Sequence, residues 1–319
     1  MSILTSTLLP SSLLIPRRTK PINSPNNKVV FHKNDHYLNR IVPQKKKASF
    51  CIQAQAQQVE PSIPSSPIIY PTVRPKFVLF GSSIIQYSYY EGWGATLAHL
   101  YARQVDIVLR GYGGWNSRTA LRVLDKVFPK NAPQQPSLVI VYFGGNDATH
   151  PQQDGNGPHV PLEEYNENMR TIFIHLQSLS ENTRILFLST PPINEEQLYG
   201  DSIPLDPPKT NESHRIYSEE GLKVCRELNI KAIDLWSAIQ EEREDWKDVS
   251  FIDGIHFTKE GSNVVSKKIL KVLREADWEP SLHWEDMPIE FKDYYTPIGP
   301  GGEPIDESNT RFPPGVEWE

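Results

Sequence analysis

The feature that most limits the possible folds is an uninterrupted apolar run at residues 137–143, Ser-Leu-Val-Ile-Val-Tyr-Phe. Its β-branched and aromatic residues favour a strand, and the absence of polar alternation indicates burial on both faces. Similar short runs occur at residues 77–80, 106–110, 184–189 and 231–234. Strands of this kind are typical of parallel sheets that are covered by helices on both sides.

Helical segments separate these runs. One segment has apolar residues at spacings of three and four, as in an amphipathic helix: Leu162, Tyr165, Met169, Ile172, Leu176 and Leu179. Other helices are expected at residues 95–102, 119–127, 215–228, and from an N-cap at Thr258 to about residue 274. Strands that alternate with helices predict βαβ units and an α/β fold with a parallel sheet.

The first of these strands ends in Gly81-Ser82-Ser83, which places a hydroxyl where open α/β sheets usually carry their chemistry. Alone, this tripeptide could equally be a polar turn. Gly114 and Asn146 follow the second and third strands, however, and the carboxyl ends of parallel strands lie at one edge of the sheet. We therefore interpret Ser83 as a nucleophile, with Gly114 N–H and the Asn146 amide as donors to an oxyanion.

A base for the serine is expected in Asp253-Gly254-Ile255-His256, just before the last helix. A serine needs a base to become nucleophilic, and a histidine needs a partner that fixes its tautomer. An Asp three residues before a His can contact the same ring. Asp253 and His256 are therefore the remaining catalytic candidates; an ordinary surface pair is the alternative.

The order of these blocks resembles the SGNH (GDSL) hydrolase superfamily, in which Ser, Gly, Asn and a D-x-x-H pair follow one another. The blocks lie at residues 80–84, 110–117, 143–147 and 253–257. Gly-Trp-Asn-Ser-Arg and Pro191-Pro192 are similar to the plant branch related to isoamyl acetate-hydrolysing esterases. The resemblance implies a flavodoxin-like three-layer αβα sandwich with a five-stranded parallel sheet. It also implies serine esterase activity without a cofactor, and Ser83 N–H as a third oxyanion donor.

Two details depart from the family pattern. The first block is usually Gly-Asp-Ser, whereas here Ser82 occupies the Asp position; that Asp supports the loop and is not the triad acid. Gly200-Asp201-Ser202-Ile203 matches the signature better, but no buried strand precedes it and it comes after the Asn block. A nucleophile needs the strand-to-turn context, so we interpret residues 200–203 as a loop.

The first 52 residues are predicted to be an organelle transit peptide. They contain nine basic residues and one acid, Asp35, and their apolar segments precede Arg17 and Arg18, the reverse of a secretory signal. A disordered tail is the alternative. The plant-like resemblance favours the plastid, with mitochondrion or cytosol as alternatives. Removal of nine bases and one acid changes the net charge from −6 to about −14.

Residues 53–75 are expected to be a Pro-rich linker, 76–277 the hydrolase domain, and 278–319 an acidic tail rich in Pro and aromatic residues. The aromatic residues suggest that the tail packs across the domain near the site; a solvated tail is the alternative. Cys51 and Cys225 form neither a disulfide framework nor a metal-ligand spacing, and we expect Cys225 to be a helix core residue.

Composition limits the classes of molecule that we expect this protein to bind. An acidic mature protein has no electrostatic reason to bind nucleic acid, and no apolar run approaches the ~18 residues of a membrane span. We expect a small-molecule or lipid ester as substrate, no cofactor and no metal. The predicted function is a serine esterase or lipase. The alternatives are a carbohydrate O-deacetylase of the same fold, or a non-catalytic ligand-binding protein, in which the Ser83 hydroxyl would not be activated.

Overall fold

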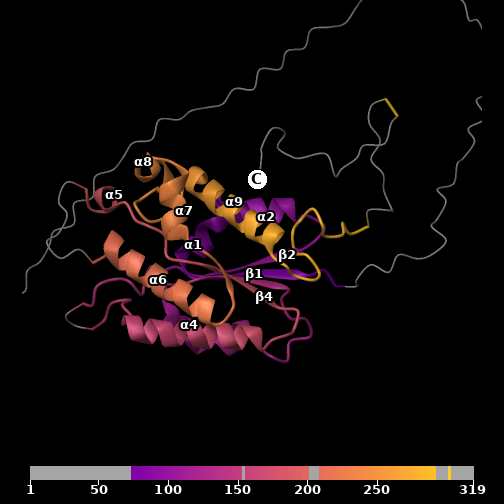
Figure 1. Ribbon diagram of the computed structural model, residues 1–319, viewed down its shortest axis with the longest axis horizontal. Helices are drawn as coiled ribbons and strands as arrows, with labels where there is room; N and C mark the ends of the chain where they lie inside the picture. The colour runs from indigo at the N-terminus through magenta and orange to yellow at the C-terminus, as the bar shows by residue number, and fades with distance from the viewer. Residues whose placement is uncertain (1–72, 153–154, 201–207, 292–300, 303–319) are drawn as a thin grey trace, which may run out of the picture. The chain divides into compact units, whose positions relative to one another are not determined.

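A sheet of five parallel strands forms the centre of the part of the chain that the computed structural model describes, residues 73–152, 155–200, 208–291 and 301–302 (Figure 1). The strand order is β2-β1-β3-β4-β5, and every pairing is parallel. The strands are β1 (Lys76–Gly81), β2 (Asp106–Gly111), β3 (Leu138–Tyr142), β4 (Arg184–Leu188) and β5 (Lys231–Ile233). This arrangement confirms the predicted parallel sheet. The proposed transit peptide and residues 53–72 of the linker lie outside the described residues.

Helices cover both faces of the sheet: α4 and α6 lie below it in Figure 1, and α2, α7 and α9 lie above it. The α-helices are α1 (Ser83–Gln86), α2 (Trp93–Leu100), α3 (Ser117–Val127), α4 (Leu162–Gln177), α5 (Glu195–Tyr199), α6 (Asn211–Glu227), α7 (Leu235–Glu242), α8 (Trp246–Ser250) and α9 (Lys259–Glu275). A 3₁₀ turn, η1 (Tyr87–Tyr89), follows α1. The expected αβα sandwich is thus confirmed.

Alternate residues of each central strand supply the two cores. In β1, Val78 and Phe80 pack in the cluster that contains residues of α3, α4 and α6, whereas Phe77 and Leu79 pack with residues of α1, α2 and α9. All of β3 is buried, as its unbroken apolar sequence predicts. Cys225 belongs to the first of these clusters, so it is the helix core residue expected, and burial raises the pKa of its thiol to about 12.

The α9 helix begins where the sequence predicts. The Thr258 side chain accepts a hydrogen bond from Gly261 N–H at 3.1 Å, which satisfies one of the free N–H groups of the first turn. This cap fixes the point at which the preceding loop, with Asp253 and His256, enters the helix.

The first part of the aromatic stretch after α9 packs on the domain. Leu282 is 5% exposed in the α2/α9 cluster, and its carbonyl accepts a hydrogen bond from Tyr101 Oη at 2.8 Å. Gln104 Nε2 donates to the carbonyls of Trp284 and Met287 at 2.7 and 2.8 Å. Since Gln104 lies two residues before the start of β2, this segment lies at the amino ends of the strands. This first part of the tail is therefore at the opposite edge from Ser83. Residues 292–300 and 303–319 lie outside the described residues, so the expected packing of the tail near the site stays a prediction for them.

Candidate active site

Ser83 is the first residue of α1, and β1 ends two residues before it. The carbonyl of Ser82 accepts hydrogen bonds from the N–H groups of Ile85 at 3.1 Å and Gln86 at 3.0 Å, so the chain turns directly from strand into helix. The N–H of Ser83 lies in the first turn of that helix and has no partner within it. The serine thus stands at the carboxyl edge of the sheet with an N–H group able to face an anion.

Gly114 lies in the loop between β2 and α3 and has a positive φ of +78°. The loop is attached to the Ser83 segment, because Gly113 N–H donates to Gln86 Oε1 at 2.7 Å and Tyr112 N–H donates to the Gly81 carbonyl at 2.8 Å. Nothing lies within 4 Å of the position that a Cβ would take on Gly114. Gly114 is also part of the lining of the pocket described below.

Asn146 follows β3 and is oriented by the Gly114 loop. Its Nδ2 donates to the Trp115 carbonyl at 2.9 Å, which uses one of its two amide hydrogens. The next residue, Asp147, is fully buried, and its Oδ1 accepts the N–H of Ser117 at 2.9 Å. These contacts join the ends of the second and third strands.

Asp253 and His256 form a hydrogen-bonded pair. Asp253 Oδ2 lies 2.6 Å from His256 Nδ1, and Oδ1 accepts the N–H groups of Ile255 and His256 at 3.0 and 2.8 Å. Partial burial raises the pKa of the Asp253 carboxyl, but these hydrogen bonds outweigh it and lower the pKa below its usual value. An ionised carboxylate can only accept, so neutral His256 carries its proton on Nδ1 and has a free lone pair on Nε2.

The loop that carries this pair is held from both sides. Phe251 and Phe257 form an antiparallel bridge, and Ile252 N–H donates to the His256 carbonyl at 2.8 Å. The ring of Tyr87, from η1, meets the His256 ring edge-on at 5.0 Å. Within the described residues His256 Nε2 has no hydrogen-bond partner.

A pocket of about 260 Å³ brings the predicted residues together. Ser83, Gly114, Asn146 and His256 line it, and Asp253 lies behind His256 through its hydrogen bond to Nδ1. The remaining lining includes an apolar part: Ile84, Tyr87 and Ile255. The arrangement combines a serine, an oriented imidazole and several hydrogen-bond donors, the groups that acyl transfer needs.

Lys209 also lines this pocket, and sequence reasoning missed it. Its Nζ donates to the Gly145 carbonyl and to Thr149 Oγ1, and burial lowers its pKa to about 8. Lys209 follows Pro207-Pro208 and belongs to no strand end, so no motif or periodicity pointed to it. Only the fold brings it beside Asn146.

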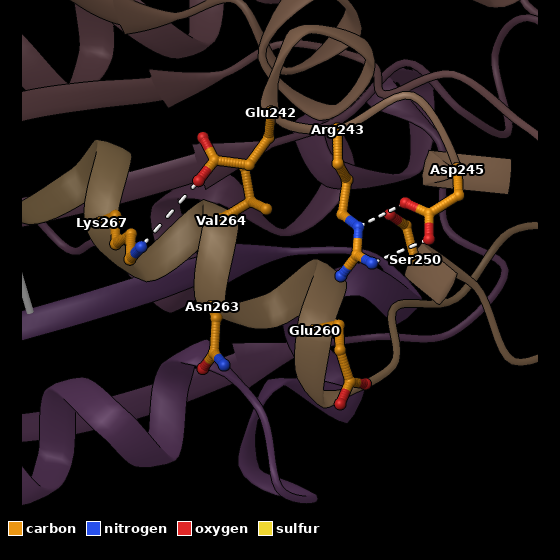
Figure 2. A pocket seen from close by; sticks show the side chains of 8 residues that line it. All are labelled: Glu242, Arg243, Asp245, Ser250, Glu260, Asn263, Val264 and Lys267. Atoms are coloured by element: carbon orange, nitrogen blue, oxygen red, sulfur yellow. Dashed lines mark hydrogen bonds and ion pairs between the residues drawn. The ribbon is translucent and has the colours of Figure 1, made fainter. Parts of the chain in front are cut away.

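A larger hollow, of about 490 Å³, lies between α7, α8 and α9 (Figure 2). Four of its charged side chains pair with one another: Arg243 with Asp245, and Lys267 with Glu242 at 3.9 Å, as the dashed lines in Figure 2 show. None of the predicted site residues lines it. It therefore offers no competing catalytic arrangement.

The second signature-like stretch, at residues 200–203, falls almost entirely outside the described residues; only Gly200, the C-cap of α5, is described. Across the described ranges, no group of three or more His, Cys, Asp or Glu side chains is arranged to hold a metal ion. The same ranges contain no helix with the length and hydropathy that a membrane crossing requires.

Solved structures share this fold at low sequence identity. A lipase/acylhydrolase from Enterococcus faecalis aligns with a TM-score of 0.50 at 18% identity, over 68% of this chain and 98% of that chain. Axe2, an acetylxylan esterase from Geobacillus stearothermophilus, aligns with a TM-score of 0.50 at 18% identity, over 62% and 93% of the two chains. At such identities the likeness concerns the fold alone.

Sequence relatives are much closer. A GDSL esterase/lipase of Arabidopsis thaliana is 60% identical over 69% of this chain and 70% of its own length. The GDSL esterase/lipase WDL1 of Oryza sativa subsp. japonica is 52% identical over 77% and 96%. The isoamyl acetate-hydrolyzing esterase 1 homolog of Bos taurus is 32% identical over 68% and 90%. The GDSL-like Lipase/Acylhydrolase family model matches residues 79–264, so the chain belongs to that family and is a carboxylic ester hydrolase.

Proposed function

We propose that this hydrolase cleaves short-chain acyl esters through a Ser83-His256-Asp253 triad. The observation that carries the proposal is the common pocket of Ser83, Gly114, Asn146 and His256, with Asp253 bonded to Nδ1 of the imidazole. Its volume of about 260 Å³ is just below the roughly 300–1,000 Å³ of clefts for drug-sized ligands. The small volume, lined in part by Ile84 and Ile255, favours a short acyl group.

In the first step, Ser83 Oγ forms a bond to the acyl carbonyl carbon while its proton passes to His256 Nε2. The oxyanion of the tetrahedral intermediate accepts hydrogen bonds from Ser83 N–H, Gly114 N–H and Asn146 Nδ2, each worth about 2.7–4 kcal/mol of barrier in comparable enzymes. The carbon–oxygen bond to the alcohol then breaks, and His256 returns its proton to the leaving oxygen. Asp253 stabilises the imidazolium in between.

In the second step, water replaces the alcohol. His256 takes a proton from the water as its oxygen adds to the acyl-enzyme carbonyl, and the same donors hold the second oxyanion. Collapse of this intermediate breaks the bond to Ser83 Oγ, and His256 gives the proton back to the serine. The products are an alcohol and a carboxylic acid, and the residues end in their starting protonation states.

A fluorophosphonate probe tests the nucleophile, because it reacts with an activated serine. We expect labelling at Ser83 by peptide mapping, and loss of labelling in Ser83→Ala and His256→Ala. Esters of p-nitrophenol with increasing acyl length then test the pocket, and turnover is expected to fall beyond short chains. Labelling of Ser202 in place of Ser83 would overturn the assignment.

An O-acetylated sugar is a second candidate substrate. Tyr87 lines the pocket and is 51% exposed, so its ring can also present an apolar face to a sugar ring outside. Release of acetate from acetylated xylo-oligosaccharide, compared with p-nitrophenyl acetate, separates the two substrates. The Tyr87→Ala variant is expected to impair the reaction with the sugar substrate more than that with p-nitrophenyl acetate, because loss of the ring against His256 affects both reactions.

We also propose the plastid as the location, on the strength of the basic, hydroxyl-rich leader at residues 1–52. A fusion of residues 1–60 to a fluorescent protein in leaf cells tests this proposal, with plastid fluorescence as the expected result. Mitochondrial or diffuse fluorescence would contradict it.

A further inference from the structure

Lys209 is held in place by its own backbone as well as by its side chain. Tyr199 Oη, from α5, donates to the Lys209 carbonyl at 2.8 Å and accepts its N–H at 2.9 Å. One residue later, Thr210 caps α6. The side chain therefore extends into the pocket wall from a fixed point.

All three donors of the Lys209 ammonium are directed at the loop after β3. Nζ contacts the Gly145 carbonyl, Thr149 Oγ1 at 2.9 Å and, more distantly, Asn146 Oδ1 at 3.5 Å. An ammonium has three donors and no acceptor, so these contacts leave none for an anionic substrate group. These contacts indicate that Lys209 holds the loop after β3 in place and does not bind the substrate.

The same contacts determine which way the Asn146 amide points. The ammonium can only donate, so Oδ1 must face Lys209; the Trp115 carbonyl can only accept, so Nδ2 must face Trp115. The second hydrogen of Nδ2 is then available to the pocket. A flipped amide would place Nδ2 against the ammonium and remove the donor from the oxyanion.

The charge of Lys209 is not neutralised by an ion pair within the described residues. Asp147 attracts it, but its Oδ1 is engaged by Ser117 N–H. His214, on α6, is neutral because burial lowers its pKa to about 3, and buried Tyr142 is neutral because burial raises its pKa. His256 and Tyr87 are the other titratable side chains in the lining of this pocket. A positive charge therefore lies directly behind the Asn146 amide.

We propose that Lys209 is a positioning residue of the oxyanion hole, which fixes the Asn146 amide with Nδ2 toward the reacting carbonyl and strengthens that donor by its positive charge. This inference rests on the proposed function of Ser83 and Asn146. An amide whose oxygen accepts from a cation is a stronger N–H donor, and its effect is largest when the oxyanion forms. Lys209 should therefore act on kcat more than on KM.

A pH dependence follows from the burial of the ammonium. Desolvation lowers the pKa of Lys209 to about 8, and Asp147 partly opposes this shift. Below that pH the charge is present; above it the charge is lost, and kcat should decline. Arginine at this position keeps its charge at any pH the enzyme tolerates, because its pKa exceeds about 12.

The test uses the full chain and compares Lys209→Met, Lys209→Arg and, as a control, Lys223→Met, which removes an exposed lysine on α6 that pairs with Glu220. Steady-state kinetics with p-nitrophenyl acetate from pH 6 to 10 gives kcat and KM, and thermal melting checks folding.

We expect Lys209→Met to lose about 10–100-fold in kcat, less than removal of a direct donor, with little change in KM. Its alkaline decline should be absent, and Lys209→Arg should restore most of kcat without the decline. Lys223→Met should match the unaltered protein.

An unchanged kcat and pH profile in Lys209→Met would overturn the inference. So would equal losses in the Met and Arg variants, since these would indicate that only the shape of the lysine matters. If Lys209→Met does not fold, Tyr199→Phe loosens the backbone of Lys209 and keeps its charge. The expected result is then a lower kcat with the alkaline decline retained, and an unaltered kcat would count against the role. Absence of fluorophosphonate labelling at Ser83 in the unaltered protein would instead overturn the proposed function, so the two failures are distinguishable.

Discussion

Nδ1 of His256 lies 2.6 Å from Oδ2 of Asp253, only three residues earlier in the chain. The proposed acid and base thus come from one loop, which leads into α9 at its Thr258 cap. The pair needs no contribution from a separate strand, so its geometry depends on the local conformation of residues 253–256.

Replacement of Asp253 by Asn should abolish most activity while it preserves the fold. The Asn Oδ1 can still accept the N–H groups of Ile255 and His256, but Nδ2 would donate to Nδ1 and force the proton onto Nε2. We expect kcat to fall by about 10³–10⁴-fold, the scale of a wrong histidine tautomer in a serine hydrolase. Kinetics at saturating p-nitrophenyl acetate measures the loss, and an unchanged melting temperature verifies the fold. A loss of less than tenfold would show that Asp253 does not orient the base.

The two adjacent serines provide an internal control for the nucleophile. Ser83→Ala should lower kcat by about 10⁴–10⁶-fold, because no other group can form the acyl-enzyme. Ser82→Ala should retain kcat within a few-fold, since Ser82 holds α1 through its carbonyl rather than its hydroxyl. Parallel measurements on both variants decide the question, and the reverse result would assign the nucleophile to Ser82.

The sheet could be predicted from sequence because its strands are buried on both faces. Unbroken apolar runs such as Leu138–Tyr142 have few other stable environments, and the helices between them are long enough to show a period. Short helices gave no such signal. α5 and α8 have five residues each, too few for a period, and they are fixed by local contacts such as the Asn194 cap of α5 at Gln197 N–H.

The residues of the candidate site also differ in whether the sequence alone could identify them. Ser83, Gly114 and Asn146 follow strands, so the rule that parallel strands share a carboxyl edge was enough to bring them together. Lys209 lies just before α6, and its position beside Asn146 depends on its contacts with Tyr199 and Gly145. Asp147 could be taken for a turn residue, and only the packed structure shows that it is fully buried. The location of Lys209 and the burial of Asp147 both depend on tertiary contacts, which no local sequence pattern encodes.

A side chain at Gly254 should disrupt the loop that carries Asp253 and His256. Its φ is +88°, and a Cβ there would lie 2.6 Å from the Asn194 carbonyl oxygen. Gly155, with φ of +70° and nothing within 4 Å, is a matched control for backbone strain alone. We expect Gly155→Ala to cost about 1–2 kcal/mol of unfolding free energy, and Gly254→Ala about 1–3 kcal/mol more with a large loss of kcat. Chemical denaturation and kinetics measure both; equal effects would show that the contact with Asn194 is unimportant.

Removal of the Asp147 charge should move the alkaline decline of activity. Burial raises the pKa of Asp147 to about 6, so it is ionised where the enzyme works, and its negative charge raises the pKa of Lys209. In Asp147→Asn that support is lost, so Lys209 should lose its proton at a lower pH than in the unaltered protein, where its pKa is about 8. The pH profile of kcat with p-nitrophenyl acetate measures the shift. An alkaline limb that stays in place would show that the two charges are not coupled.

The same substitution should change how stability depends on pH. The pKa of Asp147 is raised from 3.8 to about 6 by burial, so the folded state binds its proton more tightly than the unfolded state. Its contribution to stability is therefore greatest below pH 3.8 and is lost as the pH rises through 6. A shift of about two units corresponds to about 3 kcal/mol. In Asp147→Asn, the free energy of unfolding should no longer fall with pH on account of this carboxyl. An amide hydrogen left without a partner can lower stability, but by the same amount at every pH. Guanidinium titrations at several pH values between 4 and 7 compare the two proteins, and parallel stability curves would show that the buried carboxyl does not titrate in this range.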